Sequence, residues 1–357
     1  MHHSKVVVNC FAFFGFKRAL STNRVFSLIE EANIQRKKKL LDIYKVAFSG
    51  LDASARLQLA KSGEVWWKYA NFENREVNLP FAFKKKLHLL DSERNIDSLD
   101  DPSSPVWLAF RLAMTHNSTA IEGNKLDIGQ TKLVIDEFAI GISQGLGMSE
   151  YNDLSYSSAA IQKMPRKDVA EVVSHAAAME FARKRMFGKP LDIQTIIDVH
   201  KVLMPDLISE VSVIGLEDDT HLFRKVPIHV RGSPVVRPYG HEVPAVIEKL
   251  LCLHSKQRNL YHPLVCNSIF FMNFLMIHPF ADGNGRLARL LLFVLQHNAG
   301  FFGLMFHKHD RAAFFKLFTP YYERNEVLPI LEYTLRSNAE LLNKVSVYEQ
   351  TLVVPSF

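Results

Sequence analysis

HPFADGNGRLAR, residues 278–289, gathers a histidine, a carboxylate, two glycines around an asparagine, and two arginines into twelve positions. The apolar run over 263–277 that precedes it is predicted to be a helix in the middle of the core. Pro279 disfavours helical geometry at the residue before it, so this helix should end at His278. The glycines permit positive φ, which predicts a turn over 282–285.

The residues after this turn predict a site for phosphate groups. A second helix is expected to begin near Arg286, and its free N–H groups would point toward the turn, where backbone N–H groups can form an anion-binding nest. Arg286 and Arg289 are three positions apart and should share one face of that helix. Asp282 can hold Mg²⁺ that bridges phosphates, and His278 can accept a proton from an attacking hydroxyl group.

Structural explanations compete for each of these residues alone. A glycine-rich turn between helices is often only a loop, and a histidine before a proline is often only a helix cap. The combination in this order favours chemistry over structure. The ligands of an EF-hand are absent downstream, and no classical P-loop pattern is present.

The stretch 278–289 resembles the signature of Fic (Fido) domain proteins, H-P-F-x-[DE]-G-N-G-R-x-x-R, and matches it at every specified position. The resemblance covers roughly residues 105–340. It implies a protein adenylyltransferase that transfers AMP from ATP to a hydroxyl side chain of a target protein. It leaves open a deAMPylase that removes AMP with the same site, transfer of another phosphate-linked group, and a non-catalytic nucleotide-binding module.

The resemblance also implies roles for individual residues. His278 would be the catalytic base, and Asp282 would hold Mg²⁺, with Mn²⁺ as the alternative. Phe280 would lie in the core beneath the loop. Nucleotide-binding residues would be Gly283, Asn284 and Gly285 at the anion hole, Arg286 and Arg289 on the phosphates, and Phe315, with Phe314, near the adenine.

A second match lies upstream of the signature. STAIEGN, residues 118–124, resembles the family's inhibitory helix, here expected at about 110–123, with Ser118, Glu122 and Gly123 in the specified places. A glutamate that pairs with Arg289 would remove the partner of the γ-phosphate and add a negative charge beside it. The resemblance therefore implies an enzyme that is autoinhibited by Glu122.

The stretch FRKVPIHVRGSPVVRPYG over 223–240 is β-branched and contains turn residues, which predicts a short β-hairpin. Family members carry a flap that pairs with the backbone of the target protein, and a purely structural hairpin is the competing interpretation. The residues implied at the flap are Val226, Pro227, Ile228 and His229.

The remaining chain reads as helical, so the predicted fold is mainly α, with a helical N-terminal segment. The resemblance implies that the rest is a Fic-type helical bundle with a small β-hairpin flap. The expected organisation is a targeting or disordered extension over 1–29, a helical segment and linker over 30–104, and a Fic domain over 105–345. The polar, proline-bearing stretch 91–105 is the candidate linker.

Composition narrows the classes of function. The net charge of +6 is diffuse, which argues against a nucleic-acid partner. The three cysteines are too scattered for a disulfide framework, and no segment is apolar enough to span a membrane. The acid-free residues 1–29 resemble a mitochondrial transit peptide, which leaves mitochondrial and cytoplasmic locations open. A protein substrate is the expected partner, and the resemblance adds a homodimer.

Overall fold

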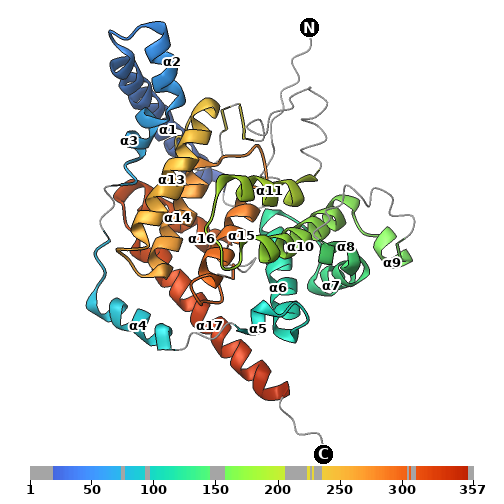
Figure 1. Ribbon diagram of the computed structural model, residues 1–357. Helices are drawn as coiled ribbons and strands as arrows, with labels where there is room; N and C mark the ends of the chain where they lie inside the picture. Colours follow the sequence, from blue (N-terminus) through green and yellow to red (C-terminus); the bar gives the residue numbers. More distant parts are fainter. Residues whose placement is uncertain are drawn as a thin grey trace, which may run out of the picture.

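A computed structural model describes residues 19–73, 77–92, 97–144, 157–205, 223–225, 227–228, 235–303, 305–306 and 311–352. These residues form helices joined by loops, and no strand occurs among them. The N-terminal helices lie at one end of the molecule, and the long last helix extends from the opposite side (Figure 1). The predicted mainly α fold is confirmed.

The helices follow one another along the whole described chain. Their bounds are α1 Ala19–Phe48, α2 Ala53–Lys61, α3 Glu64–Ala70, α4 Phe81–Ser92, α5 Asp97–Asp100, α6 Pro105–Glu122, α7 Ile128–Glu137, α8 Ala139–Gln144, α9 Ala159–Gln162, α10 Arg166–Met186, α11 Ile193–Leu203, the 3₁₀ helix η4 Gly240–Glu242, α13 Val243–Gln257, α14 Pro263–Ile277, α15 Asn284–His297, α16 Arg311–Arg324 and α17 Leu328–Leu352. Short helix α5 lies within the candidate linker 91–105, whose role as a domain boundary stays a prediction.

Helix α14 is the centre of the core. Every residue from Leu264 to Ile277 is buried, which a helix that is apolar all round requires. It packs against α13, α15 and α17. Pro263 occupies the first helical position, where a missing N–H costs nothing. The helix that carries the predicted histidine at its end is therefore fixed on all sides.

Helix α6 is held against α10 by a buried polar cluster around Glu180. One oxygen of this carboxylate accepts hydrogen bonds from the Trp107 indole at 2.9 Å and from Arg111 at 2.7 Å. Its other oxygen accepts from Arg183 at 3.0 Å. Breaking a buried pair of this kind costs several kcal/mol, about 3–5. The contacts fix the position of α6, which ends at Glu122 and is followed by Gly123 with φ 111°.

The N-terminal helices pack on the same apolar core as the rest of the chain. Leu40 and Tyr44 from α1 and Trp66 from α3 are buried members of one cluster that also contains α14 and α15. Helix α1 begins at Ala19 and so extends into the segment 1–29 that the sequence analysis set apart. Whether these helices are a separate domain stays a prediction.

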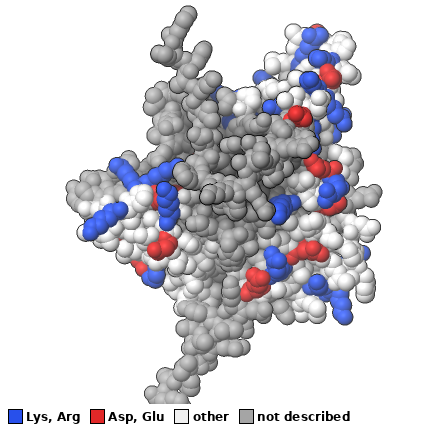
Figure 2. Space-filling model, turned by 180° about the vertical axis from the view of Figure 1, so that it is seen from behind, with Lys and Arg blue, Asp and Glu red and all other residues white. Residues whose placement is uncertain are grey.

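Charged side chains of both signs lie on one face of the described surface (Figure 2). On the face in Figure 2, lysines and arginines are interspersed with acidic residues. Within the described ranges, no helix combines the length and the apolar composition that a bilayer crossing needs.

Candidate functional site

The end of α14 places His278 in an unusual backbone conformation. Its φ of 54° and ψ of 65° are left-handed, and its N–H still donates to the Phe274 carbonyl at 2.9 Å. A residue with a side chain seldom adopts this conformation, and it is found mostly where the surroundings enforce it. The turn away from the helix at this point brings the imidazole to the head of the following loop.

Asn284 closes the loop between α14 and α15. Its side-chain oxygen accepts from the Phe280 N–H at 2.9 Å, and its amide nitrogen donates to the Phe280 carbonyl at 2.8 Å. Gly283, with φ 77°, is the N-cap of α15, and the helix itself starts at Asn284, two residues before the predicted start. The oxygen and the nitrogen of the Asn284 side chain therefore both bind Phe280 within the loop.

The ring of His200, from α11, contacts the loop at two residues. It stacks on Phe280 with 3.7 Å between ring centroids, and Phe280 is fully buried as expected. Its Nε2 donates to the Asp282 carbonyl at 3.0 Å. Burial lowers the pKa of His200 to about 4, so the ring is neutral at physiological pH. No local sequence pattern marks His200 as part of the site.

The Asp282 carboxylate lies at the N-terminus of α15. One oxygen accepts from the Gly283 N–H at 2.6 Å, and the other is 3.6 Å from the Arg286 guanidinium. The side chain is 49% exposed. A half-exposed carboxylate at a helix N-terminus is suited to hold a divalent cation that also binds substrate phosphates.

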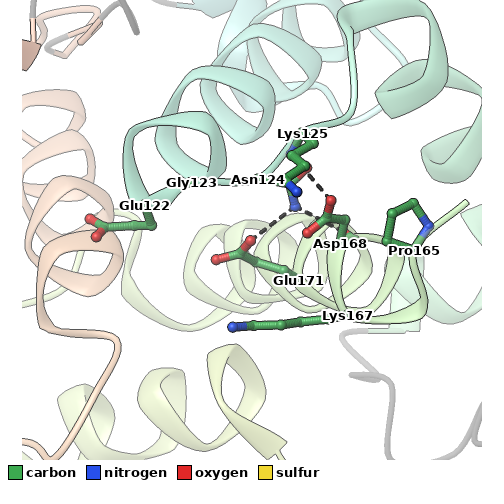
Figure 3. Close-up of a pocket in the computed structure, with 8 residues that line it drawn as sticks. All are labelled: Glu122, Gly123, Asn124, Lys125, Pro165, Lys167, Asp168 and Glu171. Atoms are coloured by element: carbon green, nitrogen blue, oxygen red, sulfur yellow. Dashed lines mark hydrogen bonds between the residues drawn. The ribbon is translucent and has the colours of Figure 1, made fainter. Parts of the chain in front are cut away.

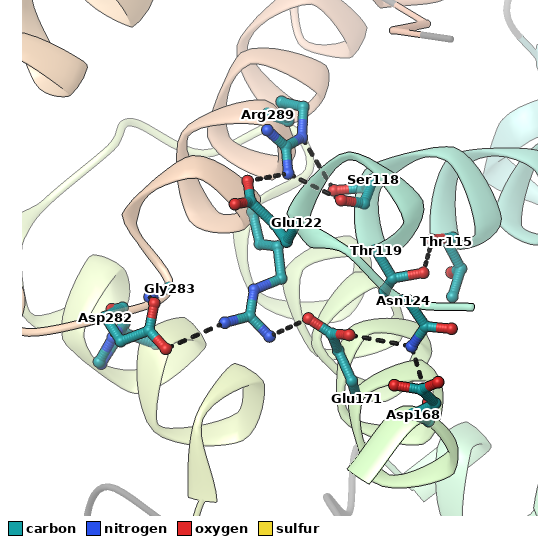
Figure 4. Close-up of polar contacts among 12 residues, drawn as sticks. Thr115, Ser118, Thr119, Glu122, Asn124, Asp168, Glu171, Asp282, Gly283 and Arg289 are labelled. Atoms are coloured by element: carbon teal, nitrogen blue, oxygen red, sulfur yellow. Dashed lines mark hydrogen bonds and ion pairs between the residues drawn. The ribbon is translucent and has the colours of Figure 1, made fainter. Parts of the chain in front are cut away.

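Arg286 lies between two carboxylates. Its NH1 donates to Glu171 of α10 at 2.7 Å, and its NH2 faces Asp282. The two carboxylates, Glu171 and Asp282, come from different elements of the chain (Figure 4). Burial raises the pKa of Glu171, and the charge of Arg286 opposes that rise. Glu171 is a member of the site that sequence reasoning missed.

Arg289 is enclosed by the end of α6. Its Nε donates to the Ser118 hydroxyl at 2.9 Å, and its NH2 donates to the Ser118 carbonyl and to a Glu122 oxygen, each at 2.9 Å (Figure 4). The Arg289 side chain is only 3% exposed, against 32% for Glu122. The structure therefore brings together the three residues that the two sequence motifs supply.

The Glu122 carboxylate also lies against the first turn of α15. A Cβ on Gly285 would come within 2.4 Å of the Glu122 Oε1 and 3.2 Å of the Arg289 NH1. Only a glycine allows this approach. The carboxylate thus occupies the space beside the backbone N–H groups where an anion was expected from the sequence.

A cavity of about 320 Å³ opens beside this cluster. It lies between the end of α6 and the start of α10, and Figure 3 shows Glu122 and Glu171 at one side of it. Its other lining residues come from 123–125, 165 and 167–168. Asn124 fixes one wall, because its amide donates to Glu171 and to the Asp168 carbonyl, both at 2.9 Å. Lysines and carboxylates are mixed in the lining, so no single charge dominates it.

The His278 ring is oriented by its own helix. Its Nδ1 lies 3.3 Å from the Leu275 carbonyl, so Nδ1 carries the proton and Nε2 is left with a lone pair. Burial lowers the pKa of His278 well below its ordinary value, and the charges of Arg237 and Arg224 lower it further. The ring is therefore neutral, which is the form a general base needs.

Arg224 secures the chain around His278. Its Nε donates to the His278 carbonyl at 2.7 Å, and its backbone N–H donates to the Pro279 carbonyl at 2.9 Å. Burial lowers the pKa of this guanidinium to about 10, so it stays charged. Arg224, which sequence reasoning also missed, lies at the start of the predicted flap.

The described residues of the predicted hairpin, 223–225, 227–228 and 235–240, form no strand. Pro227 is exposed and Ile228 is half-buried. Val226 and His229 lie outside the described residues, as do the side chains of Phe314 and Phe315 on α16. The flap and the adenine contact therefore stay predictions. Among the described residues, no group of three or more His, Cys, Asp or Glu side chains could hold a metal by itself.

Comparison with known proteins gives this geometry a context. Residues 190–296 match the model of the Fic/DOC family. The chain is 24% identical over 242 residues to a protein named "Protein adenylyltransferase Fic" from Aedes aegypti. The matched region covers 65% of this chain and 42% of that protein. A protein named "Protein adenylyltransferase fic-1" from Caenorhabditis briggsae is 25% identical over 206 residues, covering 56% and 34%. The matched region thus spans less than half the length of these relatives.

Solved structures show the same fold. A Fic domain containing signaling protein from Bacteroides thetaiotaomicron superposes with a TM-score of 0.53 at 19% identity, covering 73% of this chain and 95% of that one. Fic-1 from C. elegans superposes with a TM-score of 0.52 at 18% identity, covering 91% and 88%.

Proposed function

This chain carries a Fic/DOC family domain, and from that premise we propose that it is a protein adenylyltransferase autoinhibited by Glu122. The hydroxyl oxygen of a protein side chain attacks the α-phosphorus of ATP, the new O–P bond forms, and the bond to pyrophosphate breaks. The Nε2 of His278 accepts the hydroxyl proton. The observation that carries the proposal is the neutral His278 ring, anchored through Nδ1 to the Leu275 carbonyl beside the head of α15.

The first turn of α15 is suited to bind the phosphates of ATP. The free N–H groups of a helix N-terminus and the helix dipole favour negative charge, and Gly283 and Gly285 leave the backbone open to close approach. The Gly283 N–H already donates to a carboxylate oxygen of Asp282, so a phosphate oxygen would use the same kind of contact. Arg286 and Arg289 add fork-shaped donors on one face of the helix.

The residues present fit a divalent cation bound together with the substrate. Asp282 offers a half-exposed carboxylate at the head of the helix, and Mg²⁺ usually binds through one or two carboxylates and substrate phosphates. When bound there, the ion would neutralise charge on the phosphates of ATP. Mn²⁺ is the alternative ion.

Glu122 would hold the enzyme inactive. Its carboxylate pairs with Arg289 and lies against Gly285, so it takes the partner of the γ-phosphate and adds negative charge in the same space. Productive binding of ATP requires this side chain to move away. Gly123 follows Glu122 directly, and its left-handed backbone ends the helix at that point.

Removal of AMP from a modified protein is the second candidate activity. It is favoured by the partial exposure of Glu122, because a carboxylate with access to solvent beside the phosphate site can orient an attacking water. The remaining residues would be shared by both reactions.

Intact mass spectrometry after incubation with Mg·ATP tests the proposal. We expect Glu122→Gly to gain about 329 Da, one AMP moiety, on its own side chains or on an added protein substrate. Wild-type protein should gain little, and Glu122→Gly combined with His278→Ala should gain nothing. An inert Glu122→Gly protein would contradict the transferase and favour a module that only binds nucleotide. Loss of AMP from a pre-modified protein by the wild type alone would support the reverse reaction.

A further inference from the structure

A fully buried carboxylate lies at the start of α13, away from the nucleotide site. Glu242 accepts a hydrogen bond from the Tyr44 hydroxyl at 2.5 Å and another from the Tyr239 N–H at 2.8 Å. Burial raises the pKa of Glu242, while both hydrogen bonds and the charge of Arg224 lower it. A buried carboxylate without such partners would cost several kcal/mol, so each partner matters.

The hydroxyl that binds Glu242 comes from the N-terminal helix α1, 198 positions earlier in the chain. The Tyr44 ring packs between Phe48 and Tyr239, at 5.6 and 5.5 Å between ring centroids. These contacts hold the ring in place independently of its hydroxyl. Helix α1 therefore places one hydroxyl group against the buried Glu242 carboxylate, with its orientation fixed.

Helix α3 contacts the segment that precedes Glu242 at a second point. The indole N–H of Trp66 donates to the Val236 carbonyl at 3.0 Å. Just before α3, a Cβ on Gly63 would come within 2.5 Å of the Val246 side chain and 3.3 Å of the Glu242 carbonyl. Residues 235–242, which lead out of the flap, are thus pinned by the N-terminal helices.

Residues 235–242 in turn hold the segment that leads into the flap. The Arg224 guanidinium donates to the Pro238 carbonyl at 2.7 Å, and the charge of Glu242 favours its charged form against burial. A Cβ on Gly240 would come within 2.4 Å of the Lys225 carbonyl, so the two segments are in direct backbone contact.

Arg224 carries these contacts to the end of α14. It donates to the carbonyls of His278 at 2.7 Å and Ile277 at 3.2 Å, which have lost their partners in the helix. His278 keeps its left-handed backbone only while its surroundings enforce it.

We infer that Tyr44 and Glu242 are positioning residues for His278. They fix Arg224, and Arg224 fixes the carbonyls around His278. The N-terminal helices α1 and α3 thereby help to set the geometry of the candidate site. The kinetic consequence rests on the proposed function, whereas the structural consequence does not.

Tyr44→Phe is the decisive variant, because it removes the hydroxyl and leaves the ring contacts. In the Glu122→Gly background, we expect kcat for AMP transfer to fall about tenfold while KM for ATP stays within about twofold. Tyr261→Phe, which removes a hydroxyl from a half-buried tyrosine elsewhere, should change neither. An unchanged kcat, or a rise in KM alone, would overturn the inference.

Hydrogen exchange followed by mass spectrometry separates the inference from the proposed function. In otherwise wild-type protein, Tyr44→Phe should speed exchange of the Arg224 and His278 amides about tenfold and leave α10 unchanged. Even if Glu122→Gly transfers no AMP, this result supports a relay of contacts from Tyr44 through Glu242 and Arg224 to His278. Unchanged exchange at both amides, or a uniform rise over the whole chain, refutes it.

A double-variant cycle tests whether Tyr44 acts through Glu242. Glu242→Gln removes the charge next to Arg224 and one of the two acceptors. If the residues form one relay, the effect of Tyr44→Phe on exchange at His278 should shrink to less than about twofold once Glu242→Gln is present. Effects that simply multiply would show that Tyr44 acts by another route.

Discussion

The Glu122 carboxylate lies 2.9 Å from the Arg289 guanidinium, although the two residues are 167 positions apart. They are the last residue of α6 and an interior residue of α15, and the same guanidinium also binds both the hydroxyl and the carbonyl of Ser118. Helix α6 is in turn fixed on α10 through Glu180. The ion pair therefore joins two rigid elements and is not a chance contact of surface side chains.

Glu122→Gln removes the negative charge of this side chain and keeps its size and shape. The amide keeps an oxygen that accepts from Arg289, and it removes the negative charge from the space beside Gly285. We expect ATP to bind about tenfold more tightly and AMP to change less than about twofold, because only ATP brings a γ-phosphate. Isothermal titration calorimetry measures both, with Glu137→Gln at the end of α7 as control. Equal gains for ATP and AMP would contradict the charge argument.

Gly285→Ala tests how closely the carboxylate approaches α15. The new methyl would meet the Glu122 Oε1 at 2.4 Å, so the variant should lower the free energy of unfolding in the wild type. In the Glu122→Gly background the 2.4 Å contact is gone, and only the end of the flexible Arg289 side chain, at 3.2 Å, must shift. Alanine should then be neutral or stabilising by up to about 1 kcal/mol because it favours the helix. Urea denaturation of the four proteins gives the coupling, expected at about 1–2 kcal/mol. If the two substitutions change the free energy of unfolding additively, the Glu122 carboxylate does not lie against Gly285 in solution.

Much of the architecture could be predicted from local patterns. The apolar run 263–277 became α14 with the predicted bounds, because Pro263 and Pro279 limit it at both ends. Asp192 caps α11, with its side chain accepting a hydrogen bond from the Thr195 N–H. These features depend on neighbours along the chain, which periodicity and capping rules describe well.

The residues that sequence reasoning missed are those whose role depends on distant partners. Glu171 lies 115 positions from Arg286, and Arg224 lies 54 positions from His278. Each looks like an ordinary charged residue in its own segment. Their pairing is decided by how α10 and the chain before α13 pack around α14 and α15, which no local rule encodes.

Asn284→Ala should loosen the loop that carries the candidate site. It removes both hydrogen bonds to Phe280 and leaves the buried N–H and carbonyl of that residue unpaired. We expect the free energy of unfolding to fall by about 1–3 kcal/mol, with Asn259→Ala on the surface as a neutral control. Thermal or chemical denaturation checks the stability. A loss below about 0.5 kcal/mol would mean that water or a changed backbone replaces these contacts.

The dependence of kcat/KM on pH tests the state of His278, because this ratio reports the groups of the free enzyme. The pKa of His278 is lowered well below 6.5 by burial and by Arg237 and Arg224, so the ring loses its proton before the pH rises to 6.5. Activity of the Glu122→Gly protein should therefore stay level as the pH falls from about 8 to about 6, whereas a base with an ordinary pKa would be half protonated near 6.5.

Arg237→Gln provides the comparison for that profile. Removing a neighbouring positive charge raises the pKa of His278, so the loss of activity on acidification should begin at higher pH. Arg237→Lys keeps the charge and should follow the parent profile. Titration of ATP itself is identical in all three proteins, so it cancels from the comparison. The opposite outcome is that kcat/KM of the Glu122→Gly protein already falls by half near pH 6.5 and that Arg237→Gln does not change this. That outcome would show that another group takes the proton.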